Sequence, residues 1–260
     1  MIFTLLFSLA CFQVWQEKNP ADDFRKYFEQ FKVDGSFVLY DLNRNSYTFS
    51  NKKQFKQQFI PASTYKICNS LIGLETGVIP DENYVIKWDG RKHDAPEWNR
   101  DHTMQSAFKY SVVWYYQELA RRVGGAKEKY WLDKVRYGNA DTSGGIDRFW
   151  LTGKLRITPE QQIDFLKRLY RNQLPFSSRS MDIVRKIMVA EQTPQYILRA
   201  KTGWSEQDGL SIGWYVGYVE RDKNVYFFAT CIQSRNPDET DFGKARIDIT
   251  RNILKEMKIL

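Results

Sequence analysis

Apolar and polar residues alternate over short stretches near both ends of the chain, a pattern typical of β-strands. Polar turns at residues 41–46 and 221–224 separate two pairs of these stretches. The predicted strands cover residues 36–40, 47–50, 196–201, 212–220 and 225–233. We therefore expect both ends of the chain to contribute strands to one sheet.

Between and beside these strands, apolar residues recur at helical spacing. This spacing predicts helices over residues 21–31 and 180–190, and another that begins after Thr158, where Pro159 and Gln161 complete a capping signal. A carboxy-terminal helix is marked by Phe242, Ile249, Ile253 and Met257. The sequence thus predicts an α/β fold, with α and β layers: a mainly antiparallel sheet from both chain ends, flanked by helices, with an inserted all-helical domain.

A length of 260 residues suits one sizeable domain, or two small ones that share a core. We expect residues 19–60 and 195–260 to form the sheet domain and residues 61–194 to form the helical domain. A functional site is expected at the interface between them.

The composition excludes two broad classes of protein. Hydrophobic residues make up 42% of the chain and charged residues 27%, so a disordered chain is excluded. Two histidines, His93 and His102, are too few for a His-rich zinc hydrolase, and no metal is expected. A Ser-His-Asp triad would have to use one of these two residues.

The net charge of +8 arises from 39 Lys and Arg against 31 Asp and Glu, and the cations are spread along the chain without a dense block. This distribution favours a solvated surface with a mild preference for anionic ligands over nucleic-acid binding. No nucleic-acid partner is expected.

The amino terminus is uncharged from Met1 to Gln16, and residues 2–15 are mostly apolar. Such a run is shorter than the about 20 residues needed to span a bilayer, so stable membrane insertion is not expected. It fits a secretory signal peptide over residues 1–18, although no Lys or Arg precedes it; a buried first strand or helix is the alternative. The signal would direct the protein out of the cytoplasm, to the periplasm of a bacterium. Lipoprotein anchoring at Cys11 is not expected, because the residues before it match that pattern poorly.

Cys68 and Cys231 remain after removal of such a signal. Export would permit a disulfide between them. Because Cys68 lies in a helical pattern and Cys231 in a strand pattern, we expect two buried free thiols.

The segment around Ser63 and Lys66 is the first candidate for chemistry. A helix that begins near Ser63 places these residues three apart on one face. A neutral lysine can act as the base that a serine nucleophile needs. Taken alone, the pattern favours a helix-capping Ser and a surface Lys.

Two further elements are unremarkable by themselves. Ser111, followed by Val112 and Val113, precedes a helical pattern and could cap that helix. Lys201, followed by Thr202 and Gly203, ends a predicted strand, where the lysine could hold an anionic substrate or simply occupy a strand edge.

The order of these elements is more specific than any one of them. Ser-x-x-Lys, Ser-x-Val, Tyr137-Gly138-Asn139 and Lys-Thr-Gly follow one another, and Phe149-Trp150-Leu151 follows the third. This combination resembles the penicillin-recognising serine enzymes, and specifically the class D, oxacillinase-type β-lactamases. The resemblance extends from about residue 37 to the carboxyl end and implies a β-lactamase/transpeptidase-like fold.

The resemblance implies the hydrolysis of β-lactam antibiotics, and hence antibiotic resistance. Ser63 would form the acyl-enzyme. Lys66 would react with CO2 to give an N-carboxylated side chain that acts as general base in acylation and deacylation, so no other cofactor is implied. Trp150 would donate its indole N–H to the carboxylated lysine. Ser111 would relay a proton to the lactam nitrogen, and Lys201 would shape the field around it.

Substrate binding is implied for a second group of residues. Arg246 would pair with the substrate carboxylate and Thr202 would add a hydrogen bond. Backbone N–H groups of Ser63 and Trp204 would form the oxyanion hole. The other implied contacts are Trp98, Val113, Leu151 and Gly203.

Other functions share these motifs. A β-lactam sensor domain acylates with little turnover, and a penicillin-binding transpeptidase acts on peptidoglycan; Trp150 and the class D form of the motifs argue against the transpeptidase. The sequence leaves the preferred lactams and the oligomeric state undetermined.

Overall fold

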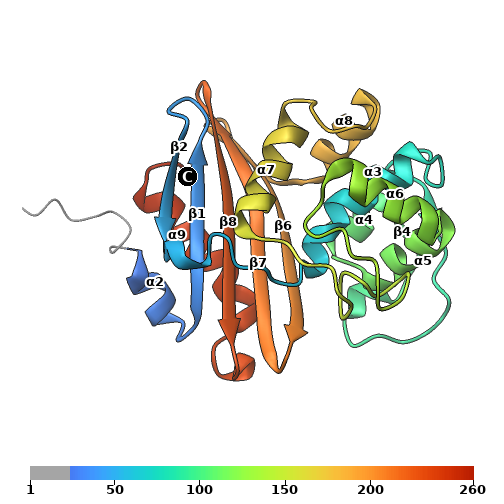
Figure 1. Ribbon diagram of the computed structural model, residues 1–260, viewed down its shortest axis with the longest axis horizontal. Coiled ribbons are helices and arrows are strands. Elements are labelled where there is room, and N and C mark those ends of the chain that lie inside the picture. Colours follow the sequence, from blue (N-terminus) through green and yellow to red (C-terminus); the bar gives the residue numbers. More distant parts are fainter. Residues whose placement is uncertain (1–23) are drawn as a thin grey trace, which may run out of the picture.

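The computed structural model describes residues 24–260 and is built around a six-stranded antiparallel sheet in the order β2-β1-β8-β7-β6-β5 (Figure 1). The strands are β1 (Asp34–Asp41), β2 (Ser46–Ser50), β5 (Val189–Gln192), β6 (Tyr196–Gln207), β7 (Leu210–Arg221) and β8 (Asn224–Ser234). Strand β1 pairs with β8, so strands from the early and the late part of the described chain lie side by side in the sheet. This arrangement confirms the predicted fold class.

Helices flank the sheet and form a separate group beside β6 (Figure 1). Their bounds are α2 (Arg25–Gln30), α3 (Lys66–Glu75), α4 (Met104–Lys109), α5 (Val113–Val123), α6 (Gly125–Val135), α7 (Pro159–Tyr170), α8 (Ser178–Ile187) and α9 (Phe242–Glu256). A small second sheet joins β3 (Val85–Ile86) to β4 (His102–Thr103). None of the helices in the described part of the chain is both long and apolar enough to cross a membrane.

The two faces of the sheet bury different helices. On one face, α2 and α9 cover Phe37, Leu39 and Phe228. On the other, α7 and the helices beside β6 share a larger core with residues such as Val216 and Phe227. The sheet and the helices beside β6 thus share one continuous core on this face.

Several local predictions are confirmed. Helix α7 begins at the capping box formed by Thr158 and Gln161, each side chain satisfying the other's backbone N–H. Cys68 and Cys231 are both buried free thiols. The predicted signal peptide, and Cys11 within it, fall outside the described residues.

Two boundaries were wrong. The helix expected to reach residue 190 ends at Ile187, and Val189 begins β5. The strand expected to end at residue 201 continues to Gln207 and pairs along its whole length with β7. The turn between them is Asp208-Gly209, with φ values of +55° and +69°, which suits a two-residue hairpin whose twist matches the strands.

Candidate active site

The Ser63 turn joins the sheet to the helical group. Residues Ala62–Tyr65 form a 3-10 helix that continues directly into α3. Before it, Phe59 pairs with Ile157 through two backbone hydrogen bonds. Ala62 adopts a φ of +50°, a left-handed conformation that is costly for a residue with a Cβ. The surrounding contacts therefore hold Ser63 in a constrained position at the start of a helix.

Lys66 lies one turn further on and is fully buried. Its Nζ donates to the Ser111 carbonyl and hydroxyl at 2.5 and 3.0 Å, and lies 3.0 Å from the Ser63 hydroxyl. Burial, with a smaller contribution from the positive charge of Lys201, holds the pKa of Lys66 well below its usual value. The alternative of a surface lysine is therefore wrong, and a neutral, nucleophilic amine is favoured beside Ser63.

Ser111 connects the two lysines. Its backbone has a φ of +55°, and the N-cap of α5 is Val112, so the alternative that Ser111 caps this helix is wrong. The hydroxyl instead accepts hydrogen bonds from Lys66 and, at 3.0 Å, from Lys201. Burial and, secondarily, Arg246 lower the pKa of Lys201 to about 7. The sequence motifs on three separate elements thus converge on one hydroxyl.

Strand β6 passes close to the Ser63 turn because Gly203 has no side chain. A Cβ at this position would lie 2.9 Å from the Pro61 carbonyl oxygen and 3.2 Å from the Thr64 methyl group. Glycine here permits close approach of two backbones. It thereby brings Thr202 and Trp204 alongside the turn.

Arg246 reaches the same strand from α9. Its Nη1 donates to the Gly203 carbonyl at 3.0 Å, and its guanidinium lies 5.7 Å from the ring centroid of the exposed Trp204. Its Nε is buried and has no hydrogen-bond partner among the described residues. Burial lowers the pKa of Arg246 to about 10. A carboxylate would supply the missing acceptor.

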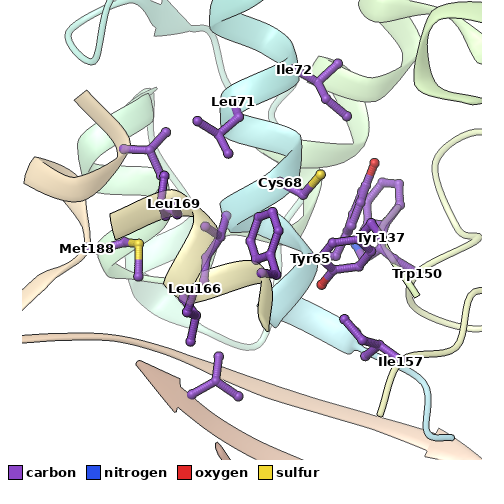
Figure 2. Close-up of a cluster of buried hydrophobic side chains, with 14 of the residues drawn as sticks. Tyr65, Cys68, Leu71, Ile72, Tyr137, Trp150, Ile157, Leu166, Leu169 and Met188 are labelled. Atoms are coloured by element: carbon purple, nitrogen blue, oxygen red, sulfur yellow. The ribbon is translucent and has the colours of Figure 1, made fainter. Parts of the chain in front are cut away.

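Trp150 is fully buried beside the Ser63 turn. Its ring lies 5.3 Å from that of Tyr65, and Figure 2 shows both with Tyr137 on one side of α3. Its indole N–H has no acceptor among the described residues, which is costly for a buried donor. The next residue, Leu151, accepts a hydrogen bond through its carbonyl from the Ser205 hydroxyl of β6.

The remaining predicted residues lie on the helical side. Trp98 donates its indole N–H to the Tyr110 carbonyl at 3.0 Å and accepts a hydrogen bond from Trp114 at its own carbonyl. Val113 is half-buried and begins α5, two residues after Ser111. The hydrogen bond to Tyr110 holds Trp98 next to the residue that precedes Ser111.

The Tyr137-Gly138-Asn139 motif makes structural contacts with the segment that follows Trp150. Asn139 exchanges hydrogen bonds with the backbone of Arg156, and a Cβ on Gly138 would meet the Arg156 carbonyl at 2.0 Å. Gly138 also adopts a φ of +55°. The motif therefore anchors the end of the segment that carries Trp150.

Sequence reasoning missed two residues next to the site. The ring of Tyr116 lies next to Lys66, whose Nζ is 5.4 Å from the ring centroid. Glu128 is fully buried and accepts a hydrogen bond from Tyr65 at 2.6 Å. The α5 pattern signals burial of Tyr116, but nothing in the sequence pairs Glu128 with Tyr65, which is 63 positions away.

Comparison with known proteins supports the assignment made from the motifs. Residues 35–255 match the penicillin binding protein transpeptidase domain family. The chain is 45% identical to beta-lactamase OXA-48 of Klebsiella pneumoniae over 246 residues, covering 95% of this chain and 91% of that protein. The chain belongs to the class D β-lactamases. A solved class D β-lactamase from Nostoc agrees, with 46% identity, a TM-score of 0.87, and coverage of 91% of this chain and 99% of that one.

Not every similar protein is named a β-lactamase. The chain is also 36% identical to the regulatory protein BlaR1 of Bacillus licheniformis, over 92% of this chain but only 39% of that protein. A class D β-lactamase from Sebaldella termitidis is 38% identical with a TM-score of 0.88, covering 92% of this chain and 96% of that one. The class D β-lactamases are serine enzymes that need no metal cofactor.

Proposed function

We propose that this class D enzyme hydrolyses β-lactams through an acyl group on Ser63, with Lys66 carboxylated by CO2. The observation that carries the proposal is the buried Lys66 amine, 3.0 Å from the Ser63 hydroxyl and favoured in its neutral form. Only a neutral amine has the lone pair that reacts with CO2, forming an N–C bond and losing one proton.

Trp150 supports the same assignment. Its buried indole N–H lacks an acceptor among residues 24–260, and an oxygen of a carboxylated Lys66 would provide one. A carboxyl group on Lys66 would supply a general base for the Ser63 hydroxyl and later for water. The half-buried Val113 and Leu151 add apolar surface that limits the access of bulk water.

In the proposed acylation, Ser63 Oγ bonds to the lactam carbonyl carbon, and the carbon–nitrogen bond of the ring breaks. Ser111 passes a proton to the departing nitrogen, since its hydroxyl contacts both Lys66 and Lys201. The backbone N–H groups of Ser63 and Trp204 stabilise the oxyanion. Water then releases the acyl group from Ser63.

Arg246 and Thr202 bind the substrate carboxylate in this proposal. The unpaired Nε of Arg246 and its position against β6 support the role. Gly203, Trp204 and Trp98 complete the proposed binding surface. The similarity to named β-lactamases supports antibiotic resistance as the biological outcome.

Hydrolysis of nitrocefin and of a penicillin panel tests the proposal, with and without added bicarbonate. Turnover that falls when bicarbonate is stripped and returns when it is restored supports the carboxylated Lys66. Turnover that ignores bicarbonate at mildly acidic pH contradicts it. Ser63→Ala serves as the control and should abolish hydrolysis.

A β-lactam sensor is the second candidate, favoured by the similarity to BlaR1. A sensor stops after one acylation, whereas an enzyme hydrolyses many nitrocefin molecules for each protein molecule. A burst of one product per chain followed by no further hydrolysis would favour the sensor.

Export to the periplasm is proposed on the apolar run at residues 2–15 alone. Fractionation of a Gram-negative host, with amino-terminal sequencing of the mature chain, tests it. A full-length chain that stays in the cytoplasm would contradict it.

A further inference from the structure

A buried phenol–carboxylate pair lies directly behind the Ser63 turn. Tyr65 stands between the Ser63 and Lys66 positions of the motif, and its hydroxyl donates to Glu128 Oε2 at 2.6 Å. Both side chains are fully buried. The second carboxyl oxygen of Glu128 has no hydrogen-bond partner among the described residues. The hydrogen bond from Tyr65 is thus the main polar contact of this carboxyl.

This pair is expensive to bury. Taking a carboxyl group out of water costs far more than burying an apolar side chain of similar size. Burial raises the pKa of Glu128 to about 7, while the hydrogen bond from Tyr65 opposes that rise. Both the charged and the neutral carboxyl can accept the phenol proton, so the contact persists through neutral pH.

The Tyr65–Glu128 pair connects α6, the Ser63 turn and the aromatic side chains around Trp150. Glu128 belongs to α6, and Tyr65 belongs to the 3-10 helix that carries Ser63. The Tyr65 ring contacts those of Trp150 at 5.3 Å, Phe149 at 5.2 Å and Tyr137 at 5.5 Å. Figure 2 shows three of these rings, those of Tyr65, Tyr137 and Trp150, gathered beside α3. A shift of the Tyr65 ring would therefore move both the Ser63 turn and the segment that contains Phe149 and Trp150.

Phe at position 65 would make the same ring contacts without needing a buried carboxyl. The hydroxyl adds one thing: a direction, since the ring must point its oxygen at Glu128. We infer that Glu128 is a positioning residue that acts through Tyr65 to fix Trp150 against the Ser63–Lys66 turn. The inference rests on the proposed function, because its effect is read from acyl-enzyme release.

Four variants test it: Tyr65→Phe, Glu128→Leu, their combination, and Glu128→Gln. Glu128→Gln keeps an oxygen that can accept the phenol proton, whereas Glu128→Leu does not. Tyr27→Phe is the control, because Tyr27 donates to Glu256 at 2.5 Å in an exposed phenol–carboxylate pair far from the site. Each deacylation rate is measured by single-turnover stopped flow with nitrocefin, at a temperature where circular dichroism shows every variant folded.

We expect Tyr65→Phe and Glu128→Leu to deacylate about tenfold more slowly, within the cost of a misplaced catalytic group. Glu128→Gln should keep most of the wild-type rate and Tyr27→Phe all of it. The combined variant should be about as slow as either single variant, because all three lack the same hydrogen bond. A combined variant that recovers the wild-type rate would show that the bond is not needed for positioning. Wild-type rates in both folded single variants would overturn the inference, as would losses that simply multiply in the combined variant.

The wild type separates this inference from the proposed function. Repeated turnover by the wild type upholds the function, and the variant ratios then judge the positioning role. If the wild type acylates once and stops, the proposed function fails. In that case the acylation rate of each variant is compared with that of the wild type, using a fluorescent penicillin. Equal acylation rates in all variants would overturn the inference.

Discussion

A Cβ atom placed on Gly203 would lie 2.9 Å from the carbonyl oxygen of Pro61. The backbone fixes the positions of both the Cβ atom and the carbonyl oxygen. A rotamer change therefore cannot relieve the contact. Strand β6 and the Ser63 turn can approach only because position 203 lacks a side chain. The short distance between β6 and the Ser63 turn therefore requires a glycine at the third position of the Lys-Thr-Gly motif.

Gly203→Ala should therefore separate β6 from the turn. We expect kcat/KM for nitrocefin to fall more than tenfold and the free energy of unfolding to fall by about 1–3 kcal/mol, the usual cost of overpacking. Gly125→Ala is the matched control, since its Cβ would lie 3.9 Å from the nearest side chain. Kinetics with nitrocefin and unfolding in urea measure both variants. Equal kcat/KM values for Gly203→Ala and Gly125→Ala would refute this account.

The pKa of Lys201 predicts how stability depends on pH. Burial lowers that pKa to about 7, against 10.5 for an ordinary lysine, so the unfolded chain binds more protons between these values. The free energy of unfolding should then rise with pH from about 7 to about 10, because a buried ammonium no longer opposes folding. Lys66 acts in the same direction.

Lys201→Met tests that slope. It keeps an unbranched side chain of similar length and removes the titrating amine. Urea unfolding at several pH values between 6 and 10 should show a shallower rise for the variant than for the wild type. Parallel curves would show that Lys201 titrates as an ordinary lysine.

Arg246 has two expected effects. Arg246→Ala should raise KM for carboxylate-bearing lactams by about tenfold or more, as expected for a lost charged hydrogen bond. It should also raise the pKa of Lys201, since the arginine charge contributes to lowering it. Steady-state kinetics across pH measure both, and Lys244→Ala, an exposed cation on the same helix, is the control. An unchanged KM would remove Arg246 from the substrate site.

The sequence alone predicts the features that depend on residues close together in the chain. Ser63 and Lys66 lie three positions apart, so helical geometry alone brings them together. The capping box at Thr158 is equally local. Lys201 could be assigned to the site only through the resemblance, because no local rule joins a strand at position 201 to a hydroxyl at position 111.

Other features required the folded chain. Asp208-Gly209 is a strong hairpin signal, and β6 extends up to it, to Gln207. The residues just before this turn are polar, so their pattern does not predict a strand. Ser111 combines a left-handed backbone with hydrogen bonds from two lysines distant in the sequence, and no local propensity predicts this combination. The partnership of Tyr65 and Glu128 depends on how α6 packs, and tertiary packing decides it.

Trp150→Phe isolates the indole N–H, because the ring contact with Tyr65 is kept while the unpaired donor is removed. If that N–H holds a carboxylated Lys66, deacylation should slow by about 100-fold, within the usual worth of a general base, and acylation should slow less. The acyl-enzyme should then accumulate on Ser63 and be seen as a mass increase by intact-protein mass spectrometry. Added bicarbonate should recover part of the rate by mass action on the weakened carboxylation. A variant with wild-type turnover and no acyl-enzyme would show that Trp150 serves packing alone, and the base for deacylation would have to be sought elsewhere in the site.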